Sequence, residues 1–286
     1  MSSKDTSRSE PKAAKSWWLG PVVVYFCMLA AMLLFALVMT PFRISGDILT
    51  VVEQWAVYAI AIAFVYLHVR RFERRKKFWQ SVGVRRKNLG QSIIWLFALL
   101  VIFTGIMALY WGVITSAMGT NPQEVVTEHF EQTFPDWYFA YMFFASFIPV
   151  GLSEELIFRG FTLDRFLAKG PLFAIVASSA MFSSLHLWYA AEFGFTGLPL
   201  YGGVFLLAVY WGIVYWKTRN IVGLMIFHGL TNVSLSVGHF FGSGAATAMN
   251  SVLFTTGMVC LGYLLFKYIR GMFKEIELLV RGKGKV

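Results

Sequence analysis

Five polar side chains lie inside apolar stretches of this chain, at positions where a membrane-spanning segment tolerates them least. Glu154 and Glu155 are adjacent, His186 comes next, and His228 and Asn232 follow. An ionisable group in the hydrocarbon region costs a few kcal/mol, so it normally faces a protein interior or a water-filled cavity and serves a function. A carboxylate in such a cavity is a candidate general base, and histidine is the commonest partner in proton transfer. The pattern indicates a buried site for acid–base chemistry.

The first cluster combines two acids with one base. Glu155 and Arg159 are four residues apart with the acid N-terminal, which is the favourable order for a helical ion pair. Glu154 points about 100° away around the helix and lacks that partner. A structural salt bridge would explain Glu155 and Arg159, but it leaves Glu154 unexplained. We therefore expect Glu154 to be the functional carboxylate.

His186 is expected beside that acid. Phe182 precedes it by about one helical turn and can pack against its ring. If Gly170 and Pro171 form the turn between two antiparallel helices, Glu154 and His186 are each 16 residues from Gly170. Both then lie about 24 Å from the turn. A lone helix histidine is often only a hydrogen-bonded core residue, but this equality predicts that His186 meets the acid.

His228 and Asn232 share one face of a later helix because they are four residues apart. His228 lies about 12 Å from the turn at 217–220, whereas Glu154 and His186 lie about 24 Å from the turn at Gly170. The three side chains therefore meet at one depth only if the hairpin around Gly170 projects about 12 Å into the cytoplasm. We expect a cavity that opens to the cytoplasm. As an alternative, the pair could serve only as a hydrogen-bonding contact between helices.

The composition is that of an integral membrane protein, with 57% hydrophobic, 17% aromatic and 14% charged residues in 286 positions. Apolar runs long enough to cross about 30 Å of hydrocarbon predict eight transmembrane helices in one all-α domain. A β-barrel would instead show short strands of alternating polarity. The runs cover residues 19–39, 49–69, 92–116, 137–156 or beyond, 172–190, 200–216, 221–238 and 245–266.

Basic residues set the expected orientation, since cytoplasmic loops carry the excess of Lys and Arg. With eight crossings, every one of the 25 basic residues except Arg43 falls on one side, so both termini are expected in the cytoplasm. Residues 1–16 are expected as a disordered basic arm. The remaining divisions are a transmembrane domain at 17–268, with its catalytic core at about 137–238, and a basic cytoplasmic tail at 269–286.

The net charge of +10 does not call for nucleic acid, because a topology-determining bias with affinity for anionic lipid headgroups explains it. Membrane lipids are the expected partners, and nucleic acid is not. The two cysteines, Cys27 and Cys260, both fall in apolar runs, where a thiol usually acts as a small hydrophobe. No disulfide framework is indicated. An acidic segment at 120–136 is expected as a short helix at the outer surface.

Three motifs resemble those of the CPBP intramembrane proteases, which include type II CAAX prenyl endopeptidases and bacteriocin-processing or self-immunity proteins. They are Glu-Glu-x-x-x-Arg at 154–159, Phe-x-x-x-His at 182–186 and His-x-x-x-Asn at 228–232, in the family's order and on expected transmembrane helices. Each motif is weak alone, and together they are specific. The resemblance extends over about 137–238.

This resemblance implies a multi-pass membrane endopeptidase, in the cell membrane if the source is bacterial. Glu154 and His186 would activate water, and His228 and Asn232 would form the oxyanion site. The implied substrate is a lipidated or membrane-associated peptide or protein, cut near the cytoplasmic face. The supporting residues are Glu155, Arg159 and Phe182.

Cofactor use is left open. Two histidines and a carboxylate also form catalytic zinc sites with water in the open position, so zinc on Glu154, His186 and His228 is one alternative. Asn232 is a poor zinc ligand and a good oxyanion donor, which favours a reaction that requires no cofactor. A non-catalytic scaffold or immunity protein with the same fold is the other alternative, although such a protein would be expected to have lost one of the four site residues.

Overall fold

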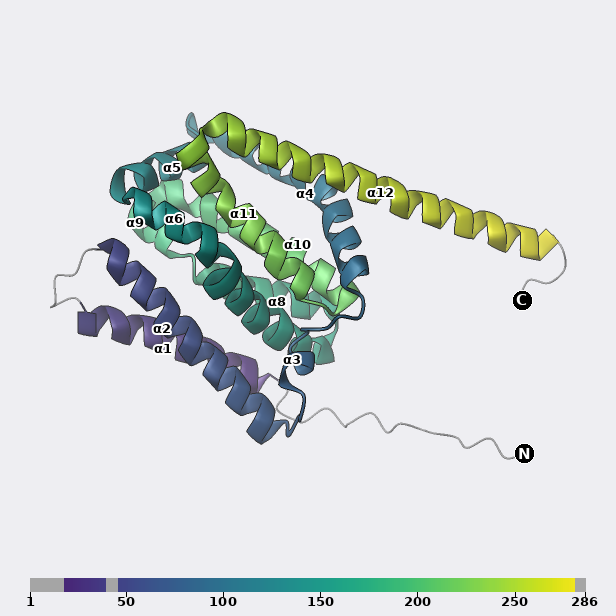
Figure 1. Cartoon of the computed structure of the whole chain (residues 1–286), viewed down its shortest axis with the longest axis horizontal. Coiled ribbons are helices and arrows are strands. Elements are labelled where there is room, and N and C mark those ends of the chain that lie inside the picture. The colour runs from purple at the N-terminus through teal and green to yellow at the C-terminus, as the bar shows by residue number, and fades with distance from the viewer. Residues whose placement is uncertain (1–17, 40–45, 281–286) are drawn as a thin grey trace.

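The computed structural model describes residues 18–39 and 46–280, which form helices joined by short turns (Figure 1). These residues contain no strand, so the predicted all-α class is confirmed for the described part of the chain. The predicted basic arm at 1–16 and Arg43 lie outside the described residues.

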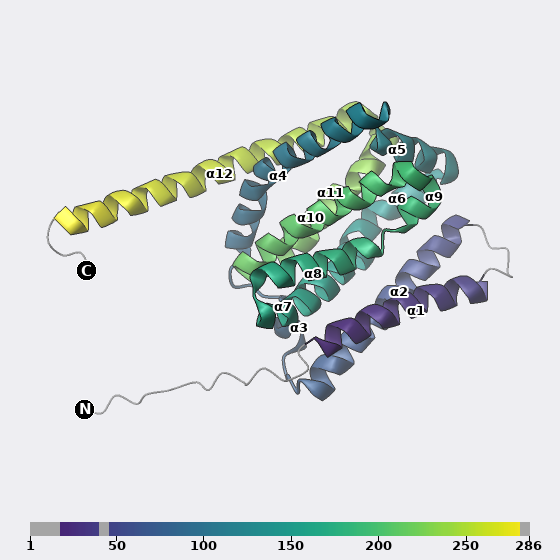
Figure 2. The same ribbon diagram turned by 180° about the vertical axis from the view of Figure 1, so that it is seen from behind.

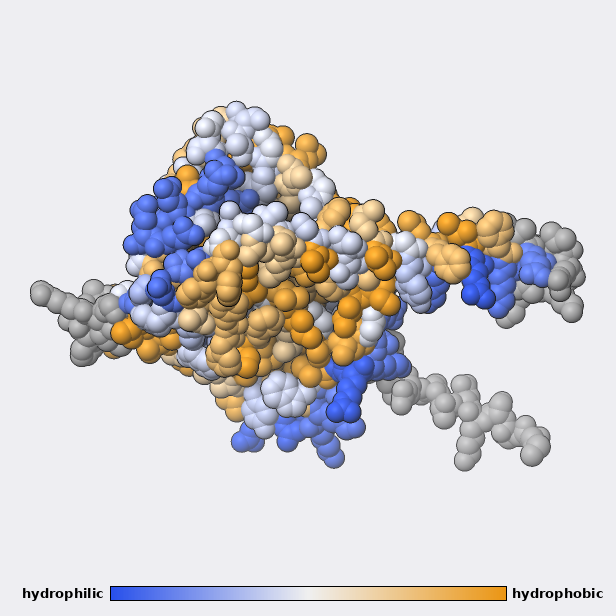
Figure 3. Space-filling model, turned by 45° about the horizontal axis from the view of Figure 1, so that its top comes forward, coloured by the Kyte–Doolittle hydropathy of each residue, from blue (hydrophilic) through white to orange (hydrophobic). Residues whose placement is uncertain are grey.

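Six helices in the described residues are long and apolar enough to cross a membrane. Two shorter apolar segments, Leu19–Phe35 and Pro171–Ser184, lie at the other two expected runs. Figure 3 shows hydrophobic residues spread broadly across one face, with hydrophilic residues gathered towards its lower edge and its upper left. A multi-pass integral membrane protein follows from these spans. The six are Gly46–Phe72, Leu89–Met118, Asp136–Lys169, Trp188–Thr218, Val222–Phe241 and Ser243–Glu275.

Helices α1 (Leu19–Met39) and α2 (Gly46–Leu67) pair along one side of the bundle (Figures 1 and 2). The helix α2 ends in a π-helical turn, η2 (His68–Phe72). Gly20 allows α1 to approach this end, because a Cβ atom there would lie 2.5 Å from His68 Nε2. The other side of α2 packs against the helix that carries Glu154.

That helix begins as α6 (Asp136–Ala145) and continues through two widened, π-helical stretches, η3 (Ser146–Leu152) and η4 (Glu155–Leu163). Pro149 lies inside η3, where it cannot donate a backbone hydrogen bond, and this accounts for a local departure from α-helical geometry. Glu154 lies between the two stretches. Such π-helical insertions are frequent at functional sites.

The hairpin turn predicted at Gly170 is present. Helix α7 (Asp164–Phe166) and the 3₁₀ turn η5 (Leu167–Lys169) lead to Gly170, whose φ of 102° suits glycine. Pro171 then begins α8 (Pro171–Ser184), in keeping with the preference for proline in a first helical turn.

The predicted helix at 172–190 is too long. Helix α8 ends at Ser184, and backbone bonds from Leu185, His186 and Leu187 to residues three positions earlier form a tight turn. The chain then re-enters a helix. His186 is therefore in a turn, and the expectation that all three motifs lie wholly on helices is wrong at this residue.

The next helices cover the hairpin. They are α9 (Trp188–Phe193), the 3₁₀ turn η6 (Gly194–Thr196), α10 (Gly197–Thr218) and α11 (Val222–Phe241). Helix α10 packs against α8, and α11 packs against α6 and η3. The motif-bearing elements therefore form the centre of the bundle (Figure 1).

A second layer consists of α4 (Leu89–Met118) and α12 (Ser243–Val280), and α5 (Pro122–Thr133) follows α4 and packs against α10. The short helix α5 occupies the acidic segment, as predicted. Helix α12 lies beside α4 and then extends beyond the bundle (Figures 1 and 2). It continues past Phe266, where the last apolar run was expected to end.

A basic loop at 73–87, which contains the one-turn helix α3 (Phe78–Ser81), contacts both η4 and the start of α11 at one end of the bundle. Gly160 of η4 lies against this loop so closely that a Cβ atom would be 2.1 Å from Val82 O. Ile221 N donates to Gly83 O at 3.0 Å, and Asn220 Nδ2 donates to Arg85 O at 2.6 Å. The loop thus fixes η4 relative to the start of α11.

Candidate active site

Glu155 is paired with Arg159, as their spacing predicts. Arg159 Nη1 donates to Glu155 Oε1 at 3.0 Å, and both residues are almost fully buried. Arg159 Nη2 lies 3.4 Å from Ala208 O on α10. A buried guanidinium needs both its counter-charge and its hydrogen-bond acceptors, because an unpaired charge in the interior is costly.

Two aromatic rings enclose the same guanidinium. Arg159 Cζ lies 4.5 Å from the centre of the Phe182 ring and 5.0 Å from the centre of the Trp211 ring. A cation over an aromatic face is attracted by the ring quadrupole, more so when water is excluded. Phe182 therefore contacts the charged pair as well as His186, whose ring centre is 5.0 Å away. The sequence predicted only the contact with His186.

His228 lies between the two carboxylates. Its Nδ1 atom is 3.0 Å from Glu155 Oε1, and its Nε2 atom is 3.6 Å from Glu154 Oε2. A carboxylate paired with a guanidinium can only accept, so Nδ1 is the donor in the contact with Glu155. The imidazole is 3% exposed and lies against Trp211, with ring centres 4.3 Å apart. Glu155 thus orients the histidine while the other ring nitrogen faces Glu154.

Tight packing brings α11 and η3 together beside this imidazole. A Cβ atom on Gly229 would lie 2.1 Å from the Phe147 ring, and one on Gly151 would lie 3.0 Å from Met225 O. Both glycines permit a close approach that any larger residue would prevent. This packing carries His228 to the carboxylates at the start of η4.

Tyr58 is the site residue that sequence reasoning missed. Its hydroxyl on α2 donates a hydrogen bond to Glu154 Oε1. Tyr58 precedes the segment that carries the motifs, and aromatic residues are common throughout this chain, so nothing in its local sequence distinguishes it. Glu154 is 6% exposed and is held from two directions, by Tyr58 of α2 and His228 of α11.

His186, which the hairpin geometry predicts beside Glu154, is held by other contacts. Its Nδ1 atom is 3.3 Å from Phe182 O, and its ring stacks with Tyr189 at a centre-to-centre distance of 6.2 Å. Within the described residues it makes no hydrogen bond or ion pair with Glu154. Both Glu154 and His228 nevertheless lie within electrostatic range of the imidazole. His186 lies in the turn that ends α8 and meets the cluster through its contact with Phe182.

Asn232 follows His228 by one turn on α11 and is partly buried. Its carboxamide makes no hydrogen bond to another described residue, so its N–H groups remain available as donors. The structure therefore brings Glu154, Glu155, Arg159 and His228 into direct contact and leaves His186 and Asn232 beside them.

The donors present do not form a three-ligand metal site. Among the residues that the structure describes, no group of three or more His, Cys, Asp or Glu side chains is placed to hold a metal ion. Glu154 and His228 Nε2 face each other, and the contact of His228 Nδ1 with the Glu155 carboxylate leaves Nε2 free to act as a ligand, as in many metal-bound histidines. His186 is not grouped with them, so the zinc set of Glu154, His186 and His228 is not assembled as three ligands in the described residues.

Residues 136–234 match the family model described as type II CAAX prenyl endopeptidase Rce1-like. This segment is Rce1-like. The match is consistent with the CPBP resemblance, and its bounds agree with the segment of about 137–238 expected from the motifs. At the level of the family, the match supports the prediction that this protein is a membrane-bound hydrolase, a protease of the CAAX endopeptidase type. No curated protein and no solved structure matches the chain.

The Rce1-like segment contains both carboxylates, both histidines and Asn232. It does not contain Tyr58 or the basic loop at 73–87. The contacts of Tyr58 with Glu154 and of Val82 with Gly160 therefore join the Rce1-like segment to helices outside it.

Proposed function

We propose that the protein is an intramembrane endopeptidase that hydrolyses a peptide bond of a lipidated or membrane-associated peptide or protein. The observation that carries the proposal is the buried cluster in which His228 lies between Glu154 and Glu155 inside the Rce1-like segment. Ionisable groups are expensive within membrane-spanning helices and are usually functional there. One ion pair accounts for Glu155 and Arg159, and it does not account for Glu154 and His228.

Glu154 acts as the base in this proposal. It takes one proton from a water molecule as the water oxygen forms a bond to the peptide carbonyl carbon. The carbonyl oxygen becomes an oxyanion, which accepts hydrogen bonds from Asn232 and, when His228 carries a proton on Nε2 as well as on Nδ1, from His228 Nε2. The C–N bond then breaks, and the proton held by Glu154 passes to the leaving nitrogen. His186 assists Glu154 in positioning the water, and no covalent enzyme intermediate forms.

Tyr58 and Glu155 act as positioning residues. Tyr58 fixes one oxygen of Glu154, and Glu155 fixes the His228 ring through Nδ1. Holding catalytic groups in a productive geometry contributes to rate because the ordering is completed before the substrate reacts. A site opening to the cytoplasm, with both chain termini on that side, belongs to the same proposal. Reporter fusions in the turns at 170 and 219 test this orientation, because both turns should report the cytoplasmic side.

The decisive variant is Glu154→Gln, which keeps the size of the side chain and removes the base. We expect it to abolish cleavage of a fluorescence-quenched peptide that ends in a farnesylated CAAX sequence, while the melting temperature in detergent stays near that of the wild type. Glu128→Gln, an exposed acid of α5, is the matched control. Cleavage by Glu154→Gln at the wild-type rate would refute the assignment.

The reaction is proposed to need no metal. Purified, active protein should contain no stoichiometric zinc and should keep its rate in chelator. Loss of activity on chelation, with recovery on adding zinc back, would overturn this part of the proposal and leave the peptidase assignment intact. A comparison of peptide termini in membranes containing wild-type and Glu154→Gln protein would then identify substrates.

A further inference from the structure

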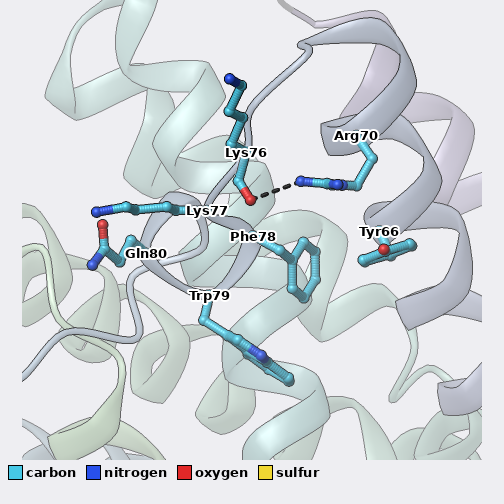
Figure 4. Close-up of a pocket in the computed structure, with 7 residues that line it drawn as sticks. All are labelled: Tyr66, Arg70, Lys76, Lys77, Phe78, Trp79 and Gln80. Atoms are coloured by element: carbon cyan, nitrogen blue, oxygen red, sulfur yellow. Dashed lines mark hydrogen bonds between the residues drawn. The ribbon is translucent and has the colours of Figure 1, made fainter.

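A hollow of about 500 Å³ lies where α2 ends, between that helix and the basic loop (Figure 4). None of the candidate catalytic residues lines it. Its lining combines three aromatic residues, three basic residues and one amide, which are Tyr66, Phe78, Trp79, Arg70, Lys76, Lys77 and Gln80.

Arg70 lines this hollow from η2, and its guanidinium is held in place. Its Nη1 atom donates to Lys76 O at 2.7 Å and to Arg75 O at 3.3 Å, which holds the guanidinium between α2 and the loop (Figure 4). The Nε and Nη2 groups make no hydrogen bond to any residue that the structure describes. A guanidinium held in place with free N–H groups is suited to two-point recognition of a phosphate.

Aromatic rings form the wall beside Arg70. The Tyr66 and Phe78 rings meet edge to face at 5.2 Å, and the Phe78 and Trp79 rings do so at 5.1 Å. Trp79 is 53% exposed, and Phe72 at the end of η2 is 78% exposed. Exposed aromatic residues at the end of a membrane-spanning helix are typical of the headgroup level of a bilayer. We therefore expect the hollow to lie at the level of the lipid phosphates.

The surrounding charge is strongly positive. Residues 70–87 contain nine Lys or Arg residues and one acid, Glu73. That acid is already engaged, because Arg165 Nη2 lies 2.8 Å and Arg75 Nε lies 2.9 Å from Glu73 Oε2. Lys76 and Lys77 have no such counter-charge among the described residues. An anion entering the hollow therefore meets an uncompensated positive field.

We propose that this hollow binds the phosphate of an anionic phospholipid headgroup, with Arg70 as the anchor and Lys76 and Lys77 beside it. A lipid is favoured over free phosphate because exposed aromatic rings flank the basic groups and can contact the glycerol and upper acyl region. The same loop packs Val82 against Gly160 and accepts a hydrogen bond from Ile221. A bound lipid would therefore stabilise the junction of α2, η4 and α11.

Native mass spectrometry of the full-length, detergent-solubilised protein tests this proposal. Short-chain phosphatidylglycerol, short-chain phosphatidylcholine and inorganic phosphate are titrated separately. The test variant is Lys76→Gln with Lys77→Gln, which removes two charges without removing a hydrogen bond. The matched control is Lys267→Gln with Lys274→Gln on exposed parts of α12. A third variant, Arg70→Lys, keeps the charge and removes the two-point donor.

We expect the Kd for phosphatidylglycerol to rise by about fivefold for each lysine lost from the loop, since each basic residue near a membrane surface contributes about 1 kcal/mol. The α12 control should change it by less than about twofold, and Arg70→Lys should weaken it while retaining the fold. Equal weakening by the loop and α12 variants would show diffuse surface charge and overturn the proposal. Equal affinity for phosphatidylcholine, or inorganic phosphate binding as tightly as phosphatidylglycerol, would also overturn it.

Discussion

His228 Nδ1 and Glu155 Oε1 lie 3.0 Å apart although 73 residues separate them in the chain. The contact joins α11 to η4 at the point where Arg159 also meets Glu155. One carboxylate oxygen therefore holds both a guanidinium and an imidazole. The stability of the fold and the orientation of a candidate catalytic group thus depend on the same side chain.

Replacing Glu155 by Gln should destabilise the protein strongly. The change leaves the Arg159 guanidinium buried without its counter-charge, and breaking a buried pair in this way typically costs about 3–5 kcal/mol. Unfolding of the detergent-solubilised protein, followed by circular dichroism, measures the loss. Glu128→Gln on the surface of α5 should change stability by less than about 0.5 kcal/mol. Equal behaviour of the two variants would contradict the structural role of Glu155.

Replacing Tyr58 by Phe should lower activity without unfolding the protein. The variant keeps the ring and loses the hydroxyl that donates to Glu154. A hydrogen bond to a charged group is worth about 1.5–3 kcal/mol, so kcat should fall by roughly 10- to 100-fold. KM should change little, because Tyr58 orients the base. Tyr263→Phe on α12, where the ring is 51% exposed, should leave kcat unchanged. If the pH–rate profile of Tyr58→Phe were identical to that of the wild type, the hydroxyl would not act on Glu154.

Replacing Gly160 by Ala should separate η4 from the basic loop. The added Cβ atom would lie 2.1 Å from Val82 O, which is backbone and cannot rotate away. Overpacking of this kind costs about 1–3 kcal/mol. Gly271→Ala on α12 is the matched control, since no atom lies within 4 Å of its added methyl group. That change should be neutral or stabilising by up to about 1 kcal/mol, because alanine is the better helix former. If Gly160→Ala were as stable as the wild type, the basic loop at 73–87 would be able to move away from the added methyl group.

Stability should depend on pH through Glu73, which lies just beyond the end of η2. Burial raises its pKa, but the hydrogen bond and charge of Arg165, with Arg75 and His68, outweigh burial and hold it below the ordinary value of 4.5. A depressed pKa in the folded state stabilises the protein above the unfolded pKa, and this contribution is lost as pH falls through the folded pKa. The melting temperature of the wild type should therefore exceed that of Glu73→Gln at pH 7 and approach it as the pH falls below 4.5 and through the folded-state pKa. A difference that is constant from pH 7 to pH 3 would exclude this ionisation as its source.

The sequence predicted those parts of the site that depend on spacing within one helix. The pairing of Glu155 with Arg159 follows from an i, i+4 interval, and the divergence of Glu154 follows from the helical rotation. The turn at Gly170 followed from a Gly-Pro pair. These relationships are local, so they survive even where the helix widens to π geometry.

Relationships between distant elements could not be predicted in the same way. The predicted depth of His186 requires α8 to be straight through this residue, but the helix ends at Ser184 and His186 lies in the following turn. The hydrogen bond from Tyr58 depends on how α2 packs against η4. Nothing in the sequence of α2 itself indicates how this helix packs against η4. Likewise, the contact of His228 with Glu155 depends on the close approach that Gly229 and Gly151 allow.

Tyr58 also bears on how far the protein can be divided. It belongs to α2, whereas its partner Glu154 belongs to the segment at 136–234. A protein shortened to that segment would lose the hydrogen-bond donor to Glu154, the proposed base, and also the loop that packs against Gly160. The first two helices are therefore not a dispensable membrane anchor that could be exchanged for another hairpin. A chimaera that grafts the segment onto foreign N-terminal helices should insert into membranes and yet turn over substrate poorly, unless a hydroxyl is restored opposite Glu154.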